Sequence, residues 1–363
     1  MTNHNLSPIK PPHGFDSSEL GFGRVFAPHM MFMEWEQGSG WTSPRIEKYA
    51  PLQLDPASAV LHYGQELFEG FKAFRTPDSR IVAFRPEANL QRMRNGAARM
   101  AMPEIDTEST LSGILDLINL DRDWVPTAPG TSLYVRPTLI ASEAFLGVRA
   151  ATKFTLFVIS SPVGSFYGKD SHHLRIWVEP HLTRAAPGGL GASKTSANYA
   201  ASLSASAEAK KRGYAQVLWL DAREHRFVEE VGTMNLFARI GDELITPPAG
   251  DSILAGITRD SVLTLAKDWG LKATMRPLSL DELFSAGRKG TLKELFGTGT
   301  AAVIAPVAEL ASATESVQVP TPNESSWCTR FRDEITGIQY GTRPDRHKWL
   351  TAVPVEAIRT VRR

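Results

Sequence analysis

The chain has 363 residues, and its 40 basic and 39 acidic side chains give a formal net charge of +1. A chain of this length exceeds one typical core and predicts two domains. The balanced charge argues against nucleic acid or an anionic membrane as the main partner. No apolar run approaches the roughly 18 residues of a membrane helix, and the N-terminal MTNHNLSPIKPPHGF lacks the apolar segment of a signal peptide.

The cysteine and histidine content limits the chemistry further. The lone Cys328 excludes an internal disulfide and a cysteine metal cluster. The nine His are scattered without paired metal spacing, so we expect no metal site. A chain without disulfides is typical of a reducing cytoplasm, which is the expected compartment.

The first half of the chain predicts a small domain at residues 21–161 that mixes helices and strands, after a disordered lead-in at residues 1–20. Pro86 marks a helix start, because proline at the first helical position lacks only an N–H that would be unpaired anyway. The expected elements are strands at 24–36 and 41–54, a hairpin with its turn at 76–79, helices at 86–102 and about 107–122, and strands at 131–142 and 153–162.

The second half predicts a larger domain at residues 174–363, separated from the first by an interdomain loop at 162–173 that is rich in Gly, Pro and Ser. Thr258 is the candidate N-cap of a helix that ends at Gly270. The expected elements are a strand at 174–180, a helix after Lys194, hairpins at 215–232 and 234–248, helices at 256–270 and 279–290, a strand and Gly-Thr turn within 293–307, and a helix at 330–341.

The chain is organised around residues 188–213, GGLGASKTSANYAASLSASAEAKKRG, in which Lys194 precedes an Ala-rich helix. Glycines before a lysine let other groups approach the backbone closely. One interpretation takes Lys194 as an amine that forms a Schiff base with a carbonyl cofactor, pyridoxal phosphate above all. The ordinary alternative is a solvated surface lysine.

A second interpretation takes GGLGASKT as a phosphate loop of the G-x-x-x-x-G-K-[ST] type. Ser193 stands where a glycine should precede the lysine. The strand at 174–180 also ends well before the glycines, whereas a phosphate loop follows its strand at once. An ATP-binding protein is therefore only a remote alternative.

A pyridoxal phosphate enzyme also needs a phosphate cradle and an acid for the pyridine nitrogen. The helix start at 256–259 and the loop at 296–301 offer backbone N–H groups, and Arg92 lies off the apolar stripe of its helix, where it can supply charge. Alternation along VEEVG sends one of Glu229 and Glu230 inward and the other to solvent. The inward carboxylate is the candidate, and an edge strand with both charges solvated is the alternative.

From about Phe22 to Trp349 the chain resembles the branched-chain amino-acid aminotransferases, enzymes of fold type IV that use pyridoxal 5'-phosphate. The resemblance is carried in order by FGRVFAPHM, HYGQELFEGFKAFR, FRPEANLQRM, YVRPTLIASEAFLGV, GGLGASKTSANYAASL, EEVGTMNLF, AGITRDS and FGTGTAAVIAPV. It implies an α/β (α+β) architecture with two mixed domains and the cofactor at the domain interface.

The resemblance also implies roles for individual residues. Lys194 matches the catalytic Schiff-base lysine, Glu230 the partner of the pyridine nitrogen, and Tyr199 the residue bonded to the phenolic oxygen of the cofactor. Arg184 matches a supporting arginine near the phosphate. The matches to the phosphate cradle are Arg92, Ile257, Thr258 and Thr300.

The substrate pocket is implied in the same way. Its matches are Phe22, Tyr63, Tyr134, Arg136, Thr233, Thr300 and Ala301, joined by Leu146 and Val148 of the partner subunit, so the resemblance implies a homodimer. The alternative for Leu146 is a core position within its own domain. Some vertebrate members carry a Cys-x-x-Cys after the Gly-Thr-Ala, whereas Ala302 and Ala305 stand here, so that redox switch is absent.

The implied reaction is a ping-pong transamination between Leu, Ile or Val and 2-oxoglutarate, which yields branched 2-oxo acids and glutamate. Because one methylene group changes the binding free energy in an apolar pocket by only about 1–3 kcal/mol, the enzyme should discriminate poorly among these three amino-group donors. Alternatives within the fold are a D-amino-acid aminotransferase and an aminodeoxychorismate lyase. A cofactor-binding protein without catalysis is an alternative of another class.

Overall fold

The computed structural model describes residues 6–11, 15, 20–164 and 174–355. The chain divides into two compact units, residues 1–166 with 337–363 and residues 167–336. Most of the expected lead-in at 1–20, and residues 165–173 of the expected interdomain loop, lie outside the described residues. The first two positions of that loop, Pro162 and Val163, instead end a strand.

The first unit is built on a nine-stranded sheet with the order β18-β6-β5-β7-β8-β1-β2, in which β3 also pairs with β1 and β4 with β7. The strands are β1 (His29–Glu36), β2 (Gly40–Trp41), β3 (Arg45–Lys48), β4 (Glu66–Phe68), β5 (Phe71–Arg75), β6 (Ile81–Phe84), β7 (Ser132–Ala141), β8 (Lys153–Val163) and β18 (Leu350–Ala352). The helices are α1 (Ala59–Tyr63), α2 (Pro86–Arg99), α3 (Thr107–Leu120) and the 3-10 helix η1 (Arg122–Trp124).

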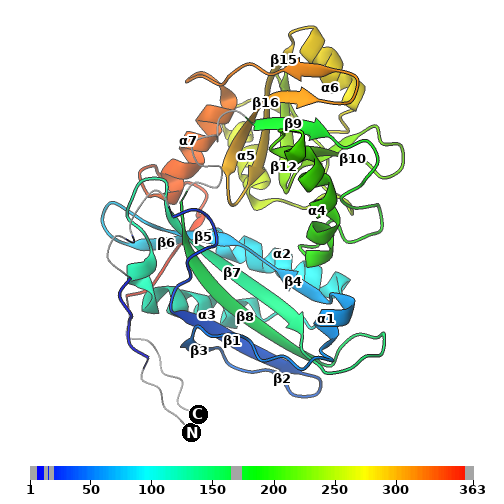
Figure 1. Ribbon diagram of the computed structural model, residues 1–363. Helices are drawn as coiled ribbons and strands as arrows, with labels where there is room; N and C mark the ends of the chain where they lie inside the picture. The colour runs from blue at the N-terminus through cyan, green and yellow to red at the C-terminus, as the bar shows by residue number, and fades with distance from the viewer. Residues whose placement is uncertain (1–5, 12–14, 16–19, 165–173, 356–363) are drawn as a thin grey trace. The chain divides into compact units, whose positions relative to one another are not determined.

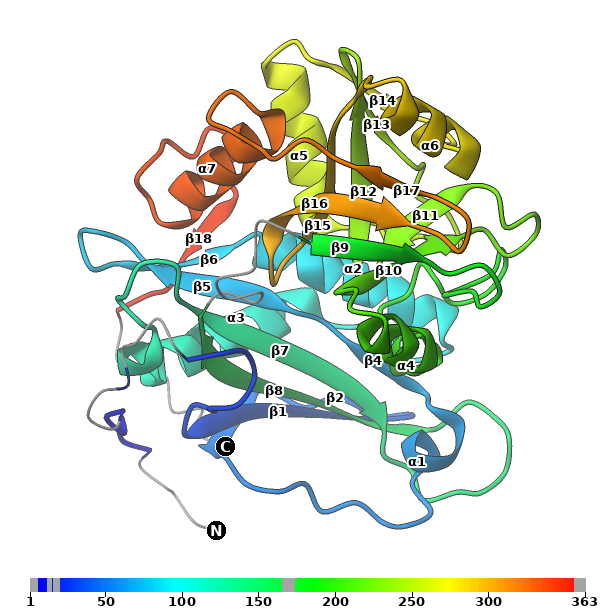
Figure 2. The same cartoon turned by 45° about the horizontal axis from the view of Figure 1, so that its top comes forward.

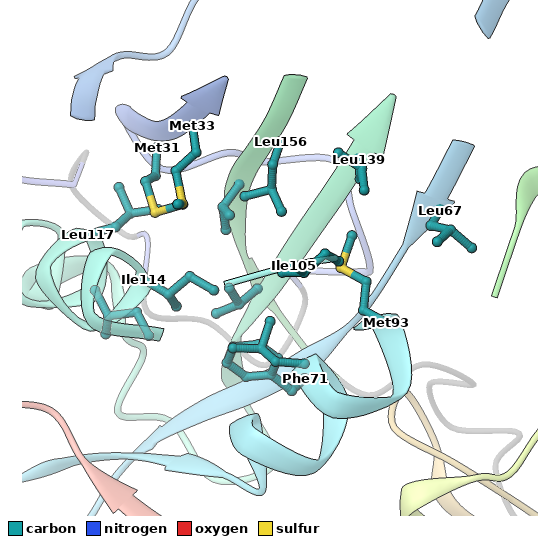
Figure 3. Packing of buried hydrophobic residues seen from close by; sticks show 14 of the residues in the cluster. Met31, Met33, Leu67, Phe71, Met93, Ile105, Ile114, Leu117, Leu139 and Leu156 are labelled. Atoms are coloured by element: carbon teal, nitrogen blue, oxygen red, sulfur yellow. The ribbon is translucent and has the colours of Figure 1, made fainter. Parts of the chain in front are cut away.

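The sequence explains why α2 and α3 form and which sides they bury. Pro86 occupies the first turn of α2, and the Asp106 side chain caps α3 by accepting the Ser109 N–H at 3.0 Å. Met93 of α2 lies in one core with Met31 of β1 and Leu156 of β8 (Figure 3), and Leu90 of α2 belongs to the same core. These elements are labelled in Figure 1. Apolar burial of this kind is the main stabilising term of a domain.

The second unit is also built on a nine-stranded sheet, with the order β11-β10-β9-β16-β15-β12-β13-β14 and β17 on β16. The strands are β9 (Leu174–Val178), β10 (Gln216–Leu220), β11 (Val228–Val231), β12 (Met234–Ile240), β13 (Glu243–Thr246), β14 (Lys272–Met275), β15 (Leu292–Gly299), β16 (Val303–Ala311) and β17 (Ser316–Gln318). The helices are α4 (Ser196–Lys211), α5 (Ile257–Asp268), α6 (Leu280–Arg288) and α7 (Trp327–Gln339), the last of which contains the boundary between the units.

An additional pairing of β11 with β12 closes part of this second sheet into a ring. The ring runs through β9, β10, β11, β12, β15 and β16, so none of these strands keeps a free edge along its whole length (Figure 2). Closure removes exposed edges and covers strand faces that would otherwise meet water. The helix that follows Lys194, α4, packs on β10 outside this ring.

The helices and strands confirm the expected mixture of helices and sheets in both halves, but two expectations about element ends are wrong. The N-cap of α5 is Gly256, and Thr258 lies one residue inside the helix. The last residues do not all belong to the second unit, because β18 pairs with β6 and extends the first sheet. Among the described residues, none of the helices combines the length and the apolar character needed to cross a membrane.

We predict that Gly113→Ala lowers the apparent melting temperature, by an amount that reflects about 1–3 kcal/mol of overpacking. Gly113 is buried within α3, and a Cβ there would lie 2.6 Å from the Met31 Sδ and 2.6 Å from the Pro44 Cβ. The matched control is Ser112→Ala, at an exposed position one residue earlier. Thermal unfolding followed by circular dichroism checks this, and an equal or higher melting temperature for Gly113→Ala would contradict the packing.

Candidate active site

The loop that carries Lys194 is held in place by close backbone packing. A Cβ at Gly191 would lie 2.5 Å from the backbone of Ser252, so only glycine allows this approach. Asn198, in the first turn of α4, donates from its amide to the carbonyls of Leu190 (2.7 Å) and Ser193 (2.9 Å). Lys194 therefore lies just before the helix, as expected, on a segment tied down at both ends.

The Lys194 amine is bonded to Tyr199, the residue that the sequence assigns to the same site as a partner of the cofactor's phenolic oxygen. Its Nζ donates to the Tyr199 Oη at 2.6 Å, and it lies 5.0 Å from the centre of the tyrosine ring. Tyr199 follows five residues later on α4, so one helix start presents both groups. A half-buried amine bonded to a tyrosine is not a solvated surface lysine.

The expected alternation of Glu229 and Glu230 is wrong, because both side chains are buried, with 6% and 2% of their surface exposed. The edge-strand alternative is also wrong, since β11 pairs with β10 on one side and β12 on the other. Both edges of β11 are therefore paired, and because all four of its residues are buried, both of its faces are covered as well. A buried carboxylate is costly unless it is paired, so each of the two needs partners.

Glu230 has a full set of partners. Its Oε2 lies 2.7 Å from the Arg184 Nε, and its Oε1 accepts the Leu254 N–H at 2.8 Å and a longer bond of 3.4 Å from Asn235. Burial raises the pKa of Glu230, and the Arg184 charge, the Leu254 N–H and the Lys194 charge oppose this rise. Glu230 is thus a buried proton acceptor within the electrostatic reach of Lys194.

Glu229 is held differently. Its Oε1 accepts a hydrogen bond from the Ser252 hydroxyl, and its Oε2 has no hydrogen-bond partner among the described residues. Burial raises the pKa of Glu229 as well, with smaller opposing contributions from Ser252 and Arg184. Of the two carboxylates, Glu230 has the stronger anionic support.

Arg184 serves the Glu230 carboxylate in this structure. Besides the ion pair, its guanidinium donates to the carbonyls of Ser252 (3.0 Å) and Gly191 (3.2 Å), and it is 8% exposed. One arginine therefore joins the carboxylate to the lysine-bearing loop. The resemblance expects a supporting role near a phosphate, whereas these contacts occupy the guanidinium with other groups.

The candidate phosphate residues of the second unit lie at a helix start and a turn. Gly256 caps α5, so Ile257 and Thr258 lie in the first helical turn, where N–H groups have no partner within the helix. Thr300 and Ala301 form the half-buried turn between β15 and β16. The hydroxyl of nearby Thr298 is buried without a hydrogen-bond partner among the described residues.

A small, partly open pocket lies in the second unit. Its lining residues are Arg184, Asn198, Tyr199, Ser202, Gly232 and Thr233. Three of them, Arg184, Tyr199 and Thr233, are residues that the resemblance assigned to the site, so this unit brings them around one hollow.

In the first unit, Arg92 points at a buried carboxylate. Its Nε and Nη2 lie 2.7 Å and 2.9 Å from the two oxygens of Glu69, whose side chain is fully buried. The Glu69 Oε2 also accepts the N–H of Gly70 at 3.0 Å. This bidentate arrangement fixes the orientation of the planar guanidinium.

Three of the candidate pocket residues of the first unit form one cluster. The rings of Phe22 and Tyr134 meet edge to face at 4.9 Å, and the Arg136 Nη2 donates to the Tyr134 Oη at 2.9 Å. A Cβ at Gly70 would overlap that tyrosine oxygen, so Gly70 makes room for it. The Arg136 Nε is buried with no hydrogen-bond partner among the described residues.

The remaining candidates of the first unit lie at its surface. The Tyr63 hydroxyl donates to the Leu146 carbonyl, which ties α1 to the loop after β7. Leu146 and Val148 are 61% and 87% exposed. The alternative that Leu146 is a core residue of its own domain is therefore wrong.

Sequence reasoning missed Glu69, Lys72 and Asn235. Lys72 is almost fully buried on β5, where burial lowers its pKa to about 8. The signal for Glu69 and Lys72 was present, because charged residues within the apolar strand pattern FEGFKAF are rarely buried without a role. Asn235, inside the apolar run MNLF, carries the same signal.

The donor set fits pyridoxal 5'-phosphate. A ring nitrogen needs a carboxylate beside it, and Glu230 is buried and paired. A phosphate monoester needs N–H groups that the helix itself does not use, which the start of α5 provides. An aldehyde needs an amine, and Lys194 lies close enough to Glu230 to influence its pKa.

Comparison with known proteins identifies relatives along most of the chain. The family described as Amino-transferase class IV matches residues 66–310. Branched-chain-amino-acid aminotransferase 2 of Bacillus subtilis is 46% identical over 338 residues, which cover 93% of each chain.

Two solved structures are similar in fold. The branched-chain amino acid aminotransferase of Escherichia coli has a TM-score of 0.74 at 26% identity, and the match covers 89% of this chain and 99% of that one. The branched-chain amino acid aminotransferase of Thermobaculum terrenum, in its form with pyridoxal phosphate, has a TM-score of 0.73 at 24% identity. That match covers 91% of this chain and 100% of the other, so the likeness in fold extends over both units.

We predict that Arg184→Met destabilises the protein by about 3–5 kcal/mol, because it leaves the buried Glu230 carboxylate without its cation. The double variant Arg184→Met with Glu230→Gln should recover part of this loss. Without the guanidinium the folded-state pKa of Glu230 rises further, so the folded protein binds the extra proton and the loss should be smaller at about pH 5 than at about pH 8. Urea unfolding at both pH values measures it.

Arg175→Met is the matched control, because Arg175 pairs with Glu309 at 2.7 Å on the surface of the same unit. An ion pair at the surface contributes little to stability, because solvent screens it. Equal losses for the two arginine variants, or no recovery in the double variant, would contradict the role given to Arg184.

Proposed function

The chain belongs to the class IV aminotransferases, and within them to the branched-chain amino-acid aminotransferases, and we propose from this that it transfers the amino group of leucine, isoleucine or valine to 2-oxoglutarate. The products are the branched 2-oxo acid and glutamate. The observation that carries the proposal is the Lys194–Tyr199 pair within electrostatic reach of the buried Glu230. The cofactor is pyridoxal 5'-phosphate.

Each chemical group of the cofactor has its own set of proposed binding residues. Glu230, supported by Arg184, would pair with the ring nitrogen, and Tyr199 would bond to the phenolic oxygen. In the second unit the phosphate would be held by the N–H groups of the α5 start, where Ile257 and Thr258 lie, and by Thr300. In the first unit, Arg92 is proposed as a cation for an anionic group.

When bound, pyridoxal 5'-phosphate supplies an electron-accepting ring that stabilises the charge left on the substrate α-carbon after loss of its proton. Lys194 accepts that proton on Nζ and returns one later, since a neutral amine is both base and, once protonated, acid. Tyr199 orients this amine through the bond of 2.6 Å. The Glu230 carboxylate, paired with Arg184, would hold a proton on the ring nitrogen.

Substrate recognition falls to the cluster of the first unit. The aromatic faces of Phe22 and Tyr134 suit a branched aliphatic side chain, and Tyr63 is a further proposed substrate contact of this unit. In the second unit, Thr233 and Ala301 are the proposed substrate contacts. The side-chain carboxylate of 2-oxoglutarate needs a cation, and Arg136 has a buried Nε without a hydrogen-bond partner among the described residues to offer.

The active form is proposed to be a homodimer, with Leu146 and Val148 reaching the pocket of the partner subunit. Support comes from the exposure of Phe145, Leu146 and Val148, at 38%, 61% and 87%. Neighbouring exposed apolar side chains are typical of an interaction site. The bond from Tyr63 to the Leu146 carbonyl holds this loop in a defined conformation.

We predict that Lys194→Ala reduces the leucine–2-oxoglutarate rate at least about a thousandfold, because the variant loses its proton-transferring group. Lys210→Ala, at the exposed end of the same helix, is the control and should keep its rate. Borohydride reduction of the wild type should place a pyridoxyl group on the peptide that contains Lys194. A label on another lysine would overturn the assignment.

The same assay separates the alternatives within the fold. Turnover of leucine, isoleucine and valine with similar kcat/KM supports the proposal, because single methylenes are weakly distinguished. Preferential turnover of D-alanine would instead favour a D-amino-acid aminotransferase. Pyruvate release from aminodeoxychorismate would favour a lyase.

We predict that Leu146→Asp weakens the dimer and raises KM for leucine, because a charge would have to be desolvated against an apolar ligand. Leu203→Asp is the control, since Leu203 on α4 is 66% exposed and lies outside this loop. Sedimentation and activity per subunit are measured together over a range of protein concentrations. A monomer that stays fully active at high dilution would contradict the shared pocket.

A further inference from the structure

Asn235 lies where the groups around Glu230 meet. It is the second residue of β12, is 5% exposed, and stands in register with Glu230 of β11 on one side and Thr298 of β15 on the other. A buried amide in an apolar strand requires partners for all its polar atoms. The partners of these atoms indicate the structural role of Asn235.

The amide nitrogen of Asn235 completes a closed circuit of hydrogen bonds. Its Nδ2 donates to the Leu254 carbonyl at 2.8 Å and to the Glu230 Oε1 at 3.4 Å, while the Leu254 N–H donates to the same Glu230 oxygen at 2.8 Å. Both acceptors face the nitrogen, which fixes the orientation of the amide. Both polar groups of the Leu254 backbone are thereby bound to the β11–β12 pair.

The amide oxygen of Asn235 contacts the next part of the same segment. A Cβ at Gly256 would overlap the Asn235 Oδ1. Gly256 has φ of −69° and ψ of 133°, values open to any residue, so its backbone conformation does not demand glycine. Glycine is required at this position because the Asn235 side chain occupies the space that a Cβ would need. Gly256 is the N-cap of α5, directly before the proposed phosphate-binding turn.

We propose that Asn235 is a positioning residue that holds the two ends of the cofactor site, the ring-nitrogen partner Glu230 and the phosphate-binding start of α5, in fixed positions. Its nitrogen holds the Glu230 carboxylate and Leu254, and its oxygen sets the position of Gly256 and hence of the α5 start. The ring-nitrogen partner and the phosphate N–H groups then keep a fixed separation that matches one rigid ligand. This inference rests on the proposed function, and it concerns a residue that touches neither the substrate nor the reacting atoms.

The test is a double-mutant cycle of Asn235→Ala and Gly256→Ala, read as affinity of the holoenzyme for pyridoxal phosphate. Each single variant should weaken retention of the cofactor on dialysis by roughly tenfold or more, the scale of a lost hydrogen bond to a charged group. The double variant should be no weaker than Asn235→Ala, because the added methyl then meets no oxygen. Independent, multiplying losses would overturn the proposal.

Gly250→Ala is the matched control. Gly250 precedes the same helix, and a Cβ there would meet nothing within 4 Å. This variant should retain the cofactor like the wild type. If Asn235→Ala fails to fold, Gly256→Ala still tests the idea, because it displaces the amide without removing it.

A spectroscopic readout separates positioning from general stability. In Gly256→Ala the visible band of the bound cofactor should titrate at a pH that differs from the wild-type value by about 0.5 unit or more, because a displaced Glu230 changes how firmly the ring proton is held. An unshifted band with a lowered melting temperature would reduce Asn235 to a structural role. A wild type without any visible band, even with added pyridoxal phosphate, would instead overturn the proposed function itself.

Discussion

The need to neutralise one buried carboxylate organises the second unit. Glu230 lies on a strand covered on both faces, where an unpaired charge costs several kcal/mol. Arg184 and the Leu254 N–H meet this need, and each brings a segment with it: Arg184 the lysine-bearing loop through Gly191, and Leu254 the start of α5. Segments far apart in sequence are thus held by one charge.

The first unit repeats this arrangement with the roles reversed. There a fully buried acid, Glu69, orients a partly buried cation, Arg92, and the next residue, Gly70, leaves room for the Tyr134 hydroxyl. A single dipeptide on the turn between β4 and β5 therefore sets both a candidate anion-binding group and a wall of the proposed pocket. In both units, the side chains with a proposed chemical role are held in place by residues that have no such role themselves.

Local patterns in the sequence predicted most of the helices and strands, and they placed Lys194 and Tyr199 together, because helix starts and hairpins are decided by neighbouring residues. They failed where distant segments decide. Alternation sent one of Glu229 and Glu230 to solvent, yet both are buried, because segments around Arg184 and Ser252 contact these side chains. Thr258 has a side chain typical of an N-cap, but the N-cap of α5 is Gly256, where the neighbouring Asn235 leaves no room for a Cβ. The sequence analysis assigned the whole C-terminal tail to the second domain. It could not foresee that β18 pairs with β6, because the two strands are separated by more than half of the chain.

The order of the strands also has a consequence for biosynthesis. The ring of the second unit needs β9 to pair with β16, and the first sheet needs β18 at its edge, so each unit receives a strand from late in the chain. Such distant pairings form slowly and only after the later segment has left the ribosome. Until then β9 lacks its neighbour β16 and β6 lacks its neighbour β18, so each unit exposes a strand edge that can pair with another chain.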